Sequence, residues 1–343
     1  MNSVANKYRS IFGDAVLALA PMAGYSTAPF RRICYDEGAD FAYTEMVSAD
    51  GLIRGGEKTF EYMRMMEGER FTGVQLFGSD PAVMAEAARI AAQNGAAFID
   101  MNFGCPVKKV IRRNGGASLM RDLDLMGRIA AAVVETVEIP VTAKIRSGWT
   151  AKDENYVEAG LVLEGAGVDA VVIHPRYRTQ GFSGRSNWEH IARLREALTI
   201  EVIGNGDVTD VEDFIELRRV TGCRIVMIGR GALGRPWLFR RIKDSLAIEA
   251  GVDVGPEVVV EGGIGETVSI ADFMLRHFEL TVSWDGERRA VSEMRKQFKW
   301  YLRGVPGAKE YRLKLMSAAD ADMVRSILRS LKEELVKRWR KLA

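Results

Sequence analysis

The chain has 343 residues, of which 47% are hydrophobic and 27% charged, and this is the composition of an ordinary globular protein. No run of eighteen apolar residues occurs and residues 1–13 are polar, so we expect neither a membrane span nor a secretory signal. The net charge of +2 is close to zero, but the charge is unevenly distributed along the chain.

Eight short apolar segments recur in the first 229 residues, and most are rich in β-branched side chains, as strands buried on both faces are. They are 16–20, 41–46, 73–77, 98–103, 141–145, 170–174, 201–204 and 224–229. Apolar residues three and four apart predict helices between them, for example at 81–94, 123–137, 155–165 and 211–220. This alternation predicts an α/β fold, a (β/α)8 barrel, with a doubly wound open sheet as the alternative.

The remainder of the chain has a different pattern. Residues 251–265 are rich in Gly, Val and Glu and are typical of a linker. Helical periodicity then predicts a small bundle from 269–284, 287–302, 309–316 and 319–342. We therefore expect a barrel at 1–248, a linker at 249–268 and a helical domain at 269–343.

The helical domain is basic. Residues 286–343 contain 16 Lys and Arg against 7 Asp and Glu, a net charge of +9, which leaves −7 for the preceding residues. A small basic part beside a larger acidic one is typical of proteins that bind polyanions, and we expect a nucleic acid. A solvated basic helix face is the simpler alternative.

Cysteine and histidine usage excludes some chemistries. Cys34, Cys105 and Cys223 are far apart and odd in number, which argues against a disulfide framework or a zinc site and indicates a cytoplasmic protein. The three histidines are equally scattered, so no metal is expected.

The segment DMNFGCP at 100–106 is the most informative one. Cys105 follows a strand-like run, on a turn that Gly104 and Pro106 force out of regular structure. Because strand ends carry the chemistry of barrel enzymes, this thiol is a candidate acid or nucleophile. A cysteine packed as a small hydrophobic residue is the alternative.

Other polar residues end the predicted strands, and a barrel would gather them at one rim. They are Pro21, Met22, Ala23, Gly24, Glu45, Gln75, Asn102, Lys144, Arg146, His174, Asn205, Gly206, Asp207, Gly229, Arg230 and Gly231. The glycine turns after the seventh and eighth strands suit a phosphate held by backbone N–H groups, unless they only close tight turns.

Lys144 and Arg146 are two apart on a strand and therefore share a face. Two buried cations need an anion or an electron-rich ligand, and a flavin fits. An ion pair with Asp100 or Glu45 is the alternative. No GxGxxG follows the first strand and no P-loop occurs, so a nicotinamide would act only as a co-substrate.

These motifs resemble the tRNA-dihydrouridine synthase family, bacterial B type. The resemblance is carried by LAPMAG at 19–24, TEM at 44–46, VQLFG at 74–78, DMNFGCP at 100–106, KIRSGW at 144–149, His174, Gln180, Gly184, Trp188, NGD at 205–207 and GRG at 229–231. It is dense over 16–239 and looser beyond. One departure is the Pro175-Arg176-Tyr177 run after His174, where such proteins usually read Gly-Arg-Thr.

The resemblance implies an enzyme that reduces the C5=C6 bond of a uridine in tRNA, with NADPH or NADH recharging a bound flavin mononucleotide (FMN). It implies that FMN is held by Pro21, Met22, Ala23, Gln75, Lys144, His174, Asn205, Gly206, Asp207, Gly229 and Arg230. Cys105 would protonate C5, and Asn102, Arg146 and His174 are candidates for holding the uracil. Phosphates beside that base would contact the basic residues after Cys105, which are Lys108, Lys109, Arg112 and Arg113.

Two other functions compete with this expectation. A flavin barrel that acts on a free pyrimidine or an enone needs no basic tail or basic loop. A barrel that only binds RNA would not need Cys105, Lys144 and His174 all in place.

Overall fold

The computed structural model describes residues 3–252, 264–305 and 307–340. By their contacts they form two compact units, Met1–Gly231 and Ala232–Ala343. The domain boundaries expected at 248 and 269 stay a prediction. Residues 253–263 of the expected linker and the last two residues of the expected helix 319–342 lie outside the described residues.

The first unit is a closed parallel barrel. Its strands are β1 (Leu17–Leu19), β2 (Phe41–Tyr43), β4 (Thr72–Phe77), β5 (Ile99–Asn102), β6 (Val141–Gly148), β7 (Ala170–Tyr177), β8 (Glu201–Asn205) and β9 (Val226–Ile228). Neighbours pair in sequence order, and the β1–β9 and β1–β2 pairings together with β2–β4 close the ring. The eight predicted strands and the barrel are confirmed, and the open-sheet alternative is wrong because no barrel strand is left at an edge. The short β3 (Val47–Ser48), which the sequence did not suggest, adds to β4.

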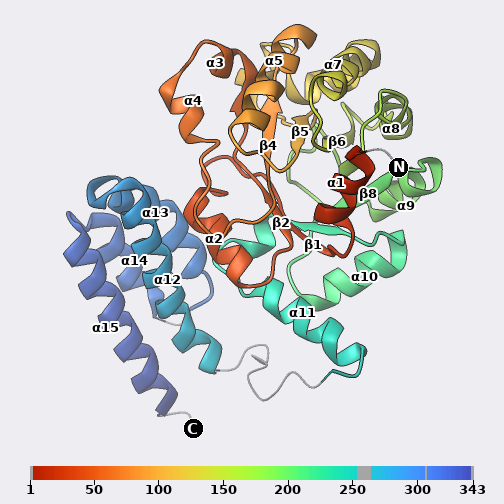
Figure 1. The fold of residues 1–343 in the computed structure, drawn as a ribbon. Coiled ribbons are helices and arrows are strands. Elements are labelled where there is room, and N and C mark those ends of the chain that lie inside the picture. The colour runs from red at the N-terminus through yellow and green to blue at the C-terminus, as the bar shows by residue number, and fades with distance from the viewer. Residues whose placement is uncertain (1–2, 253–263, 306, 341–343) are drawn as a thin grey trace. The chain divides into compact units, whose positions relative to one another are not determined.

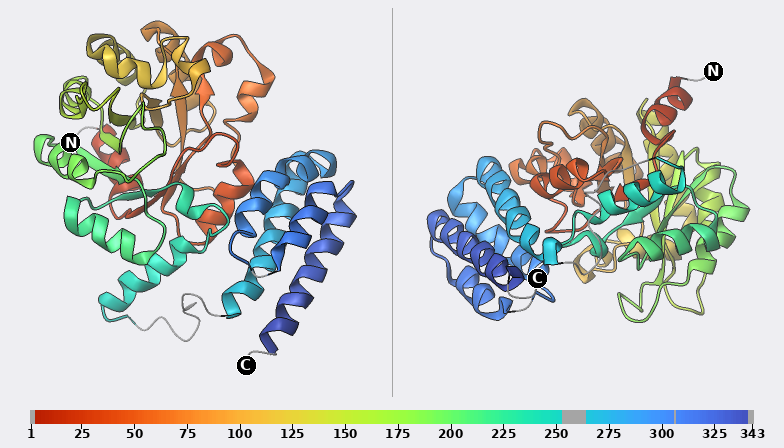
Figure 2. Two further views of the ribbon diagram at one scale, coloured as in Figure 1. Left: turned by 180° about the vertical axis from the view of Figure 1, so that it is seen from behind. Right: turned by 90° about the horizontal axis from the view of Figure 1, so that it is seen from below.

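Helices surround the strands, as Figures 1 and 2 show. They are α1 (Ser3–Phe12), α2 (Ala28–Asp36), α3 (Ala49–Ile53), α4 (Glu57–Glu61), α5 (Pro81–Gln93), α6 (Lys108–Ile111), the 3-10 helix η1 (Gly116–Arg121), α7 (Leu123–Thr136), α8 (Tyr156–Gly165), α9 (Trp188–Ala197), α10 (Val211–Thr221) and the 3-10 helix η2 (Arg230–Ala232). Capping residues fix where three of these helices begin. Asp80, Asp122 and Asp210 each accept a hydrogen bond from a backbone N–H in the first turn of the helix that follows.

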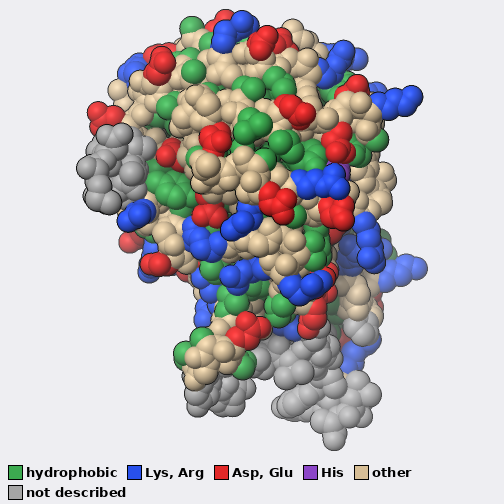
Figure 3. All heavy atoms as spheres, turned by 90° about the vertical axis from the view of Figure 1, so that its right-hand side faces the viewer, with side chains coloured by type: hydrophobic (Ala, Val, Ile, Leu, Met, Phe, Trp, Pro, Cys, Tyr) green, Lys and Arg blue, Asp and Glu red, His purple; other side chains and the backbone are tan. Residues whose placement is uncertain are grey.

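Over the face in Figure 3, acidic and basic side chains are interspersed with hydrophobic ones, as on an ordinary solvated surface.

The second unit is helical, and the four helices predicted between residues 269 and 342 correspond to its last four. Its helices are α11 (Leu238–Glu249), α12 (Ile264–Asp285), α13 (Glu287–Tyr301), α14 (Ala308–Ser317) and α15 (Ala321–Arg340). Phe278, Met294, Phe298 and Leu328 are fully or almost fully buried in its core. Among the helices that the structure describes, none has both the length and the apolar character that crossing a bilayer demands.

Aromatic side chains fill the barrel near the starts of its strands. The Phe98 ring lies 5.2 Å from that of Phe12, 5.9 Å from that of Phe41 and 5.1 Å from that of Tyr43, all near edge-to-face. Gly73 makes room for this packing, because a Cβ there would lie only 2.1 Å from the Phe98 ring. Because aromatic rings fill this end of the barrel, the polar residues lie at the opposite ends of the strands, where a functional site can form.

We expect Gly73→Ala to lower the free energy of unfolding by about 1–3 kcal/mol, because the added methyl group overpacks the aromatic core. Urea unfolding followed by circular dichroism measures this. Gly165→Ala is the matched control, since a Cβ there meets no atom within 4 Å and Gly165 ends a helix. Equal stability of the two variants would show that the Gly73–Phe98 contact does not constrain the barrel.

Candidate active site

The strand register brings most of the predicted site residues to one end of the barrel interior. Side chains two apart on a strand share a face, so every second residue of a barrel strand points into the interior. Counting along the strands in this way places these side chains inside the barrel: Gln75, Asn102, Lys144, Arg146, His174 and Asn205. Asn102 pairs with Lys144, and Arg146 pairs with His174. These residues therefore line the mouth together.

A chain of side-chain hydrogen bonds holds the turn that carries Cys105. Asn102 Oδ1 accepts hydrogen bonds from the backbone N–H of Gly104 at 3.2 Å and of Cys105 at 2.8 Å. Asn102 Nδ2 donates to Gln75 Oε1 at 2.8 Å, and Gln75 Nε2 donates to Asp100 Oδ2 at 2.6 Å. Thr142 donates to the other Asp100 oxygen at 2.6 Å. The turn is therefore fixed to the barrel interior through Asn102 and Gln75.

Cys105 lies at this mouth with only 7% of its surface exposed, and it is not in a disulfide. Burial raises its pKa above the ordinary thiol value, although the Val107 backbone N–H and Arg146 act in the opposite direction. The thiol is thus protonated at neutral pH and can serve as an acid.

Lys144 is a partly buried cation without a partner. Its Nζ makes no hydrogen bond or ion pair with another described residue, so the ion pair with Asp100 or Glu45 considered from the sequence is not found there. Burial and the nearby Arg146 lower the pKa of Lys144 to about 7, with Asp100 opposing them. An electron-rich ligand beside Lys144 would offset the cost of keeping this amine charged.

Arg146 forms hydrogen bonds that connect the active site to the loop after β7. Its Nε donates to the Gly104 carbonyl at 2.7 Å, and its Nη1 donates to the carbonyls of Tyr177 at 3.2 Å and Gly181 at 3.1 Å. Burial lowers the pKa of Arg146 to about 10, so it stays a cation at neutral pH. Arg146 thus connects the Cys105 turn with the segment after β7.

His174 is held by Arg176, whose part in the site the sequence did not reveal. Arg176 Nη1 lies 3.0 Å from His174 Nε2. Since a guanidinium can only donate, Nε2 accepts and the His174 proton sits on Nδ1. Burial and the surrounding cations hold the pKa of His174 well below its ordinary value, so the ring is neutral.

Asp207 binds the same arginine. Its Oδ2 accepts from Arg176 Nη2 at 2.6 Å and from the Ser186 backbone N–H at 2.8 Å, while Oδ1 accepts from Arg230 at 3.1 Å. Burial favours a higher pKa for Asp207, but the hydrogen bonds from Arg176 and Ser186 outweigh it and hold the pKa below its ordinary value. Asp207 is therefore a fixed carboxylate that joins the loops after β7, β8 and β9.

The loop after β7 also places an aromatic ring at the mouth. Phe182 is 57% exposed, and its ring lies 4.6 Å from the Arg230 guanidinium, 5.8 Å from that of Arg146 and 6.2 Å from the His174 ring. Nothing in the local sequence marked Phe182, because its position depends on how the loop folds back over the rim.

The two glycine turns leave backbone donors unused. The N–H groups of Gly206, Asp207 and Gly229 donate to no other group in the part of the chain that the structure describes. Gly206 has a φ of +143° and Asp207 one of +55°, while Gly229 has no positive φ and a Cβ there would make only ordinary contacts. Unpaired N–H groups at such turns suit a phosphate.

The loop after β1 completes this side of the rim. The Met22 N–H donates to Ser26 Oγ at 2.9 Å, and the Gly24 N–H donates to Glu45. Pro21 is partly buried and Ala23 exposed. Glu45, which ends the second predicted strand, is thus engaged in holding this loop.

The basic residues after Cys105 project from α6 and the turn that follows it. Lys108, Lys109, Arg112 and Arg113 are all exposed, and none of their side chains forms an ion pair with a described residue. Unneutralised cations so close to the thiol suit a polyanion. No cluster of three potential metal ligands is found within the described ranges.

Comparison with known proteins gives the family. The model of the dihydrouridine synthase family matches residues 18–338. The chain is 37% identical over 308 residues to tRNA-dihydrouridine synthase B of Pseudomonas aeruginosa, with 89% of each chain covered. It is 36% identical to the probable tRNA-dihydrouridine synthase of Rickettsia bellii, covering 86% of this chain and 88% of that one, and 36% identical to tRNA-dihydrouridine synthase B of Proteus vulgaris, covering 89% and 91%. The chain therefore belongs to the dihydrouridine synthase family.

Proposed function

We propose that this protein is an FMN-dependent tRNA-dihydrouridine synthase that reduces the C5=C6 bond of a uridine in tRNA. One observation carries the proposal: a buried, protonated thiol and an unpaired lysine lie at the same barrel mouth, with free backbone N–H groups at its rim. The relatives named above act, by their names, on the same kind of substrate.

The residues present fit FMN. Its phosphate would be held by the unpaired N–H groups of Gly206, Asp207 and Gly229, with Arg230 nearby. Lys144 would supply a cation to the ring system, whose N1–C2=O edge carries negative charge when reduced. The further contacts expected for FMN are Pro21, Met22, Ala23, Gln75, His174 and Asn205. When bound, FMN supplies the hydride for C6 of the uracil, with NADPH or NADH as the reductant.

Cys105 donates the proton to C5. Its raised pKa keeps the Sγ proton in place at neutral pH, and the hydrogen bonds from Asn102 fix the backbone that aims the thiol. Arg146, which stays charged, and the Nδ1–H of His174 are donors suited to the uracil carbonyls. The Asn102 carboxamide is already bonded at both ends, so we assign it chiefly to positioning Cys105.

Positively charged side chains bind the phosphates of the RNA. A uridine must leave its stack to reach a barrel mouth, and the phosphates on either side then lie at the rim. Lys108, Lys109, Arg112 and Arg113 carry four unneutralised positive charges there. The excess positive charge of residues 286–343 adds a second contact surface. A flavin enzyme for a free pyrimidine would need neither feature.

Replacing the proton donor tests the mechanism. We expect Cys105→Ala to bind FMN and tRNA but to form dihydrouridine at least about 100-fold more slowly, because general acid catalysis of this kind contributes about 10²–10⁴-fold. Mass spectrometry of digested tRNA measures the product. Cys223→Ala is the control, as Cys223 is equally buried but lies before β9, away from the mouth. A Cys105→Ala rate equal to that of the control would contradict the assignment.

The low pKa of Lys144 predicts a pH dependence of FMN binding. Above pH 7 the free protein holds Lys144 increasingly as the neutral amine, whereas FMN favours the ammonium, so binding takes up a proton. The Kd for FMN should therefore rise by up to about tenfold per pH unit between pH 7 and 9. Quenching of flavin fluorescence on titrating apoprotein gives the Kd. In Lys144→Met this rise should vanish, and an unchanged slope there would refute the role of Lys144.

Neutralising the basic residues after Cys105 tests whether they bind the RNA. Lys108→Gln/Lys109→Gln should weaken tRNA binding and lower the slope of log K against log salt by about 0.7–0.9 for each phosphate that is no longer neutralised. Filter binding at several salt concentrations measures both. Arg89→Gln/Arg219→Gln removes the same charge from ion-paired sites on α5 and α10 and should change little. Identical salt slopes for the two double variants would remove the loop from the RNA interface.

A further inference from the structure

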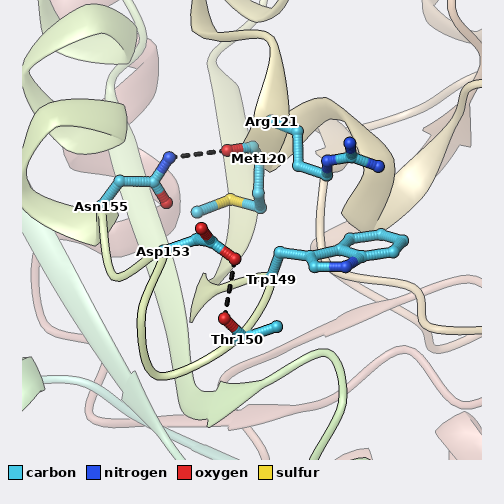
Figure 4. A pocket seen from close by; sticks show the side chains of 6 residues that line it. All are labelled: Met120, Arg121, Trp149, Thr150, Asp153 and Asn155. Carbon is cyan, nitrogen blue, oxygen red and sulfur yellow. Dashed lines mark hydrogen bonds between the residues drawn. The ribbon is translucent and has the colours of Figure 1, made fainter.

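Beside the active site, the barrel rim holds a polar pocket of about 560 Å³. It is lined by Met120, Arg121, Trp149, Thr150, Asp153 and Asn155, which Figure 4 shows. Trp149 and Thr150 directly follow β6, Arg121 ends η1, and Asn155 precedes α8. None of these residues has a role in the chemistry described above.

Two arginines without partners stack on the indole at this pocket. The guanidinium of Arg121 lies 5.1 Å from the centre of the Trp149 ring, and that of Arg178 lies 4.7 Å from it. Neither side chain forms a hydrogen bond or an ion pair with a described residue, and Arg178 Nε is buried without an acceptor. Cation–π contact with Trp149 holds the guanidiniums in place but leaves their donors unused. Of the two, Arg121 lines the cavity, and a guanidinium with unused donors beside a cavity suits a phosphate group.

The wall of the pocket also contains an unused acceptor. Asn155 Nδ2 donates to the Met120 carbonyl at 2.6 Å, which fixes the amide, while Asn155 Oδ1 is buried without a partner. Asp153 accepts a hydrogen bond from Thr150 at 2.7 Å and adds a carboxylate to the lining. A bare phosphate would satisfy Arg121 but not Asn155 Oδ1, which requires a donor such as a ribose hydroxyl or a base amino group. A nucleotide carries both a phosphate for the arginine and hydroxyl or amino donors for Asn155 Oδ1.

The loops that form this pocket are the ones that form the active site. The Ala117 N–H, on η1, donates to the Cys105 carbonyl at 3.0 Å, and Arg121 lies at the other end of η1. The Arg178 N–H donates to the Gly148 carbonyl at 3.0 Å, at the end of the strand that carries Lys144 and Arg146. A nucleotide bound here is therefore a near neighbour of the reacting base.

We propose that this pocket binds a nucleotide of the tRNA close to the target uridine, with its phosphate on Arg121 and its sugar or base edge towards Asn155. The proposal rests on the proposed function. RNA is favoured over a dinucleotide because the unpaired cations extend along one segment, from Lys108 to Arg121, on the Cys105 side of the mouth. On the other side, Arg176 and Arg230 are paired with Asp207.

The test compares Arg121→Gln and Arg121→Glu with Arg128→Gln and Arg128→Glu, which change an exposed arginine on α7 outside the pocket. Because Arg121 is itself exposed, folding should be retained. We expect Arg121→Gln to weaken binding of an unmodified tRNA transcript about five- to tenfold at low salt, with a salt slope smaller by about 0.7–0.9, and Arg121→Glu to weaken it further.

Two readouts separate the possible failures. If wild-type protein forms dihydrouridine but the Arg121 and Arg128 variants bind tRNA equally, the pocket proposal is overturned while the proposed function stands. A raised KM for NADPH with unchanged tRNA affinity would assign the pocket to the dinucleotide and also overturn it. Absence of dihydrouridine formation by wild-type protein would instead refute the proposed function.

Discussion

The side chain of Asn102 joins the barrel interior to the turn that carries the thiol. It accepts hydrogen bonds from two backbone N–H groups of that turn and donates to Gln75, which in turn is bound to Asp100. A buried network of this kind is stable only when each member is satisfied, so it admits one arrangement of the turn. Because Lys144 pairs in register with Asn102, the same constraint fixes the thiol relative to the lysine.

The site is electrostatically divided. On the side of Asp207, the arginines Arg176 and Arg230 are neutralised, and Arg176 orients the His174 ring. On the side of Cys105, the cations from Lys108 to Arg121 have no acidic partners among the described residues. A cofactor phosphate needs few well-placed donors, whereas a polynucleotide needs a longer row of available charge. The division therefore suits an enzyme that holds a small cofactor firmly and a large RNA reversibly.

Much of this was predictable from the sequence, for identifiable reasons. The barrel strands are short apolar runs that periodicity reveals, and strand ends in a barrel must converge, so Cys105, Lys144 and His174 could be brought together from sequence alone. What could not be predicted depends on packing between distant segments. The bonds from Arg176 to His174 and Asp207, the position of Phe182 and the stacking of Arg121 and Arg178 on Trp149 leave no local pattern.

In the proposed reaction, the active site passes reducing equivalents to a uridine within tRNA. The most direct measurement is an anaerobic single turnover in which protein reduced by NADPH is mixed with unmodified tRNA or with free uracil. We expect tRNA to restore the absorbance of the oxidised flavin and to gain 2 Da at one uridine for each flavin reoxidised, while uracil does neither. Reoxidation by uracil and not by tRNA would contradict it.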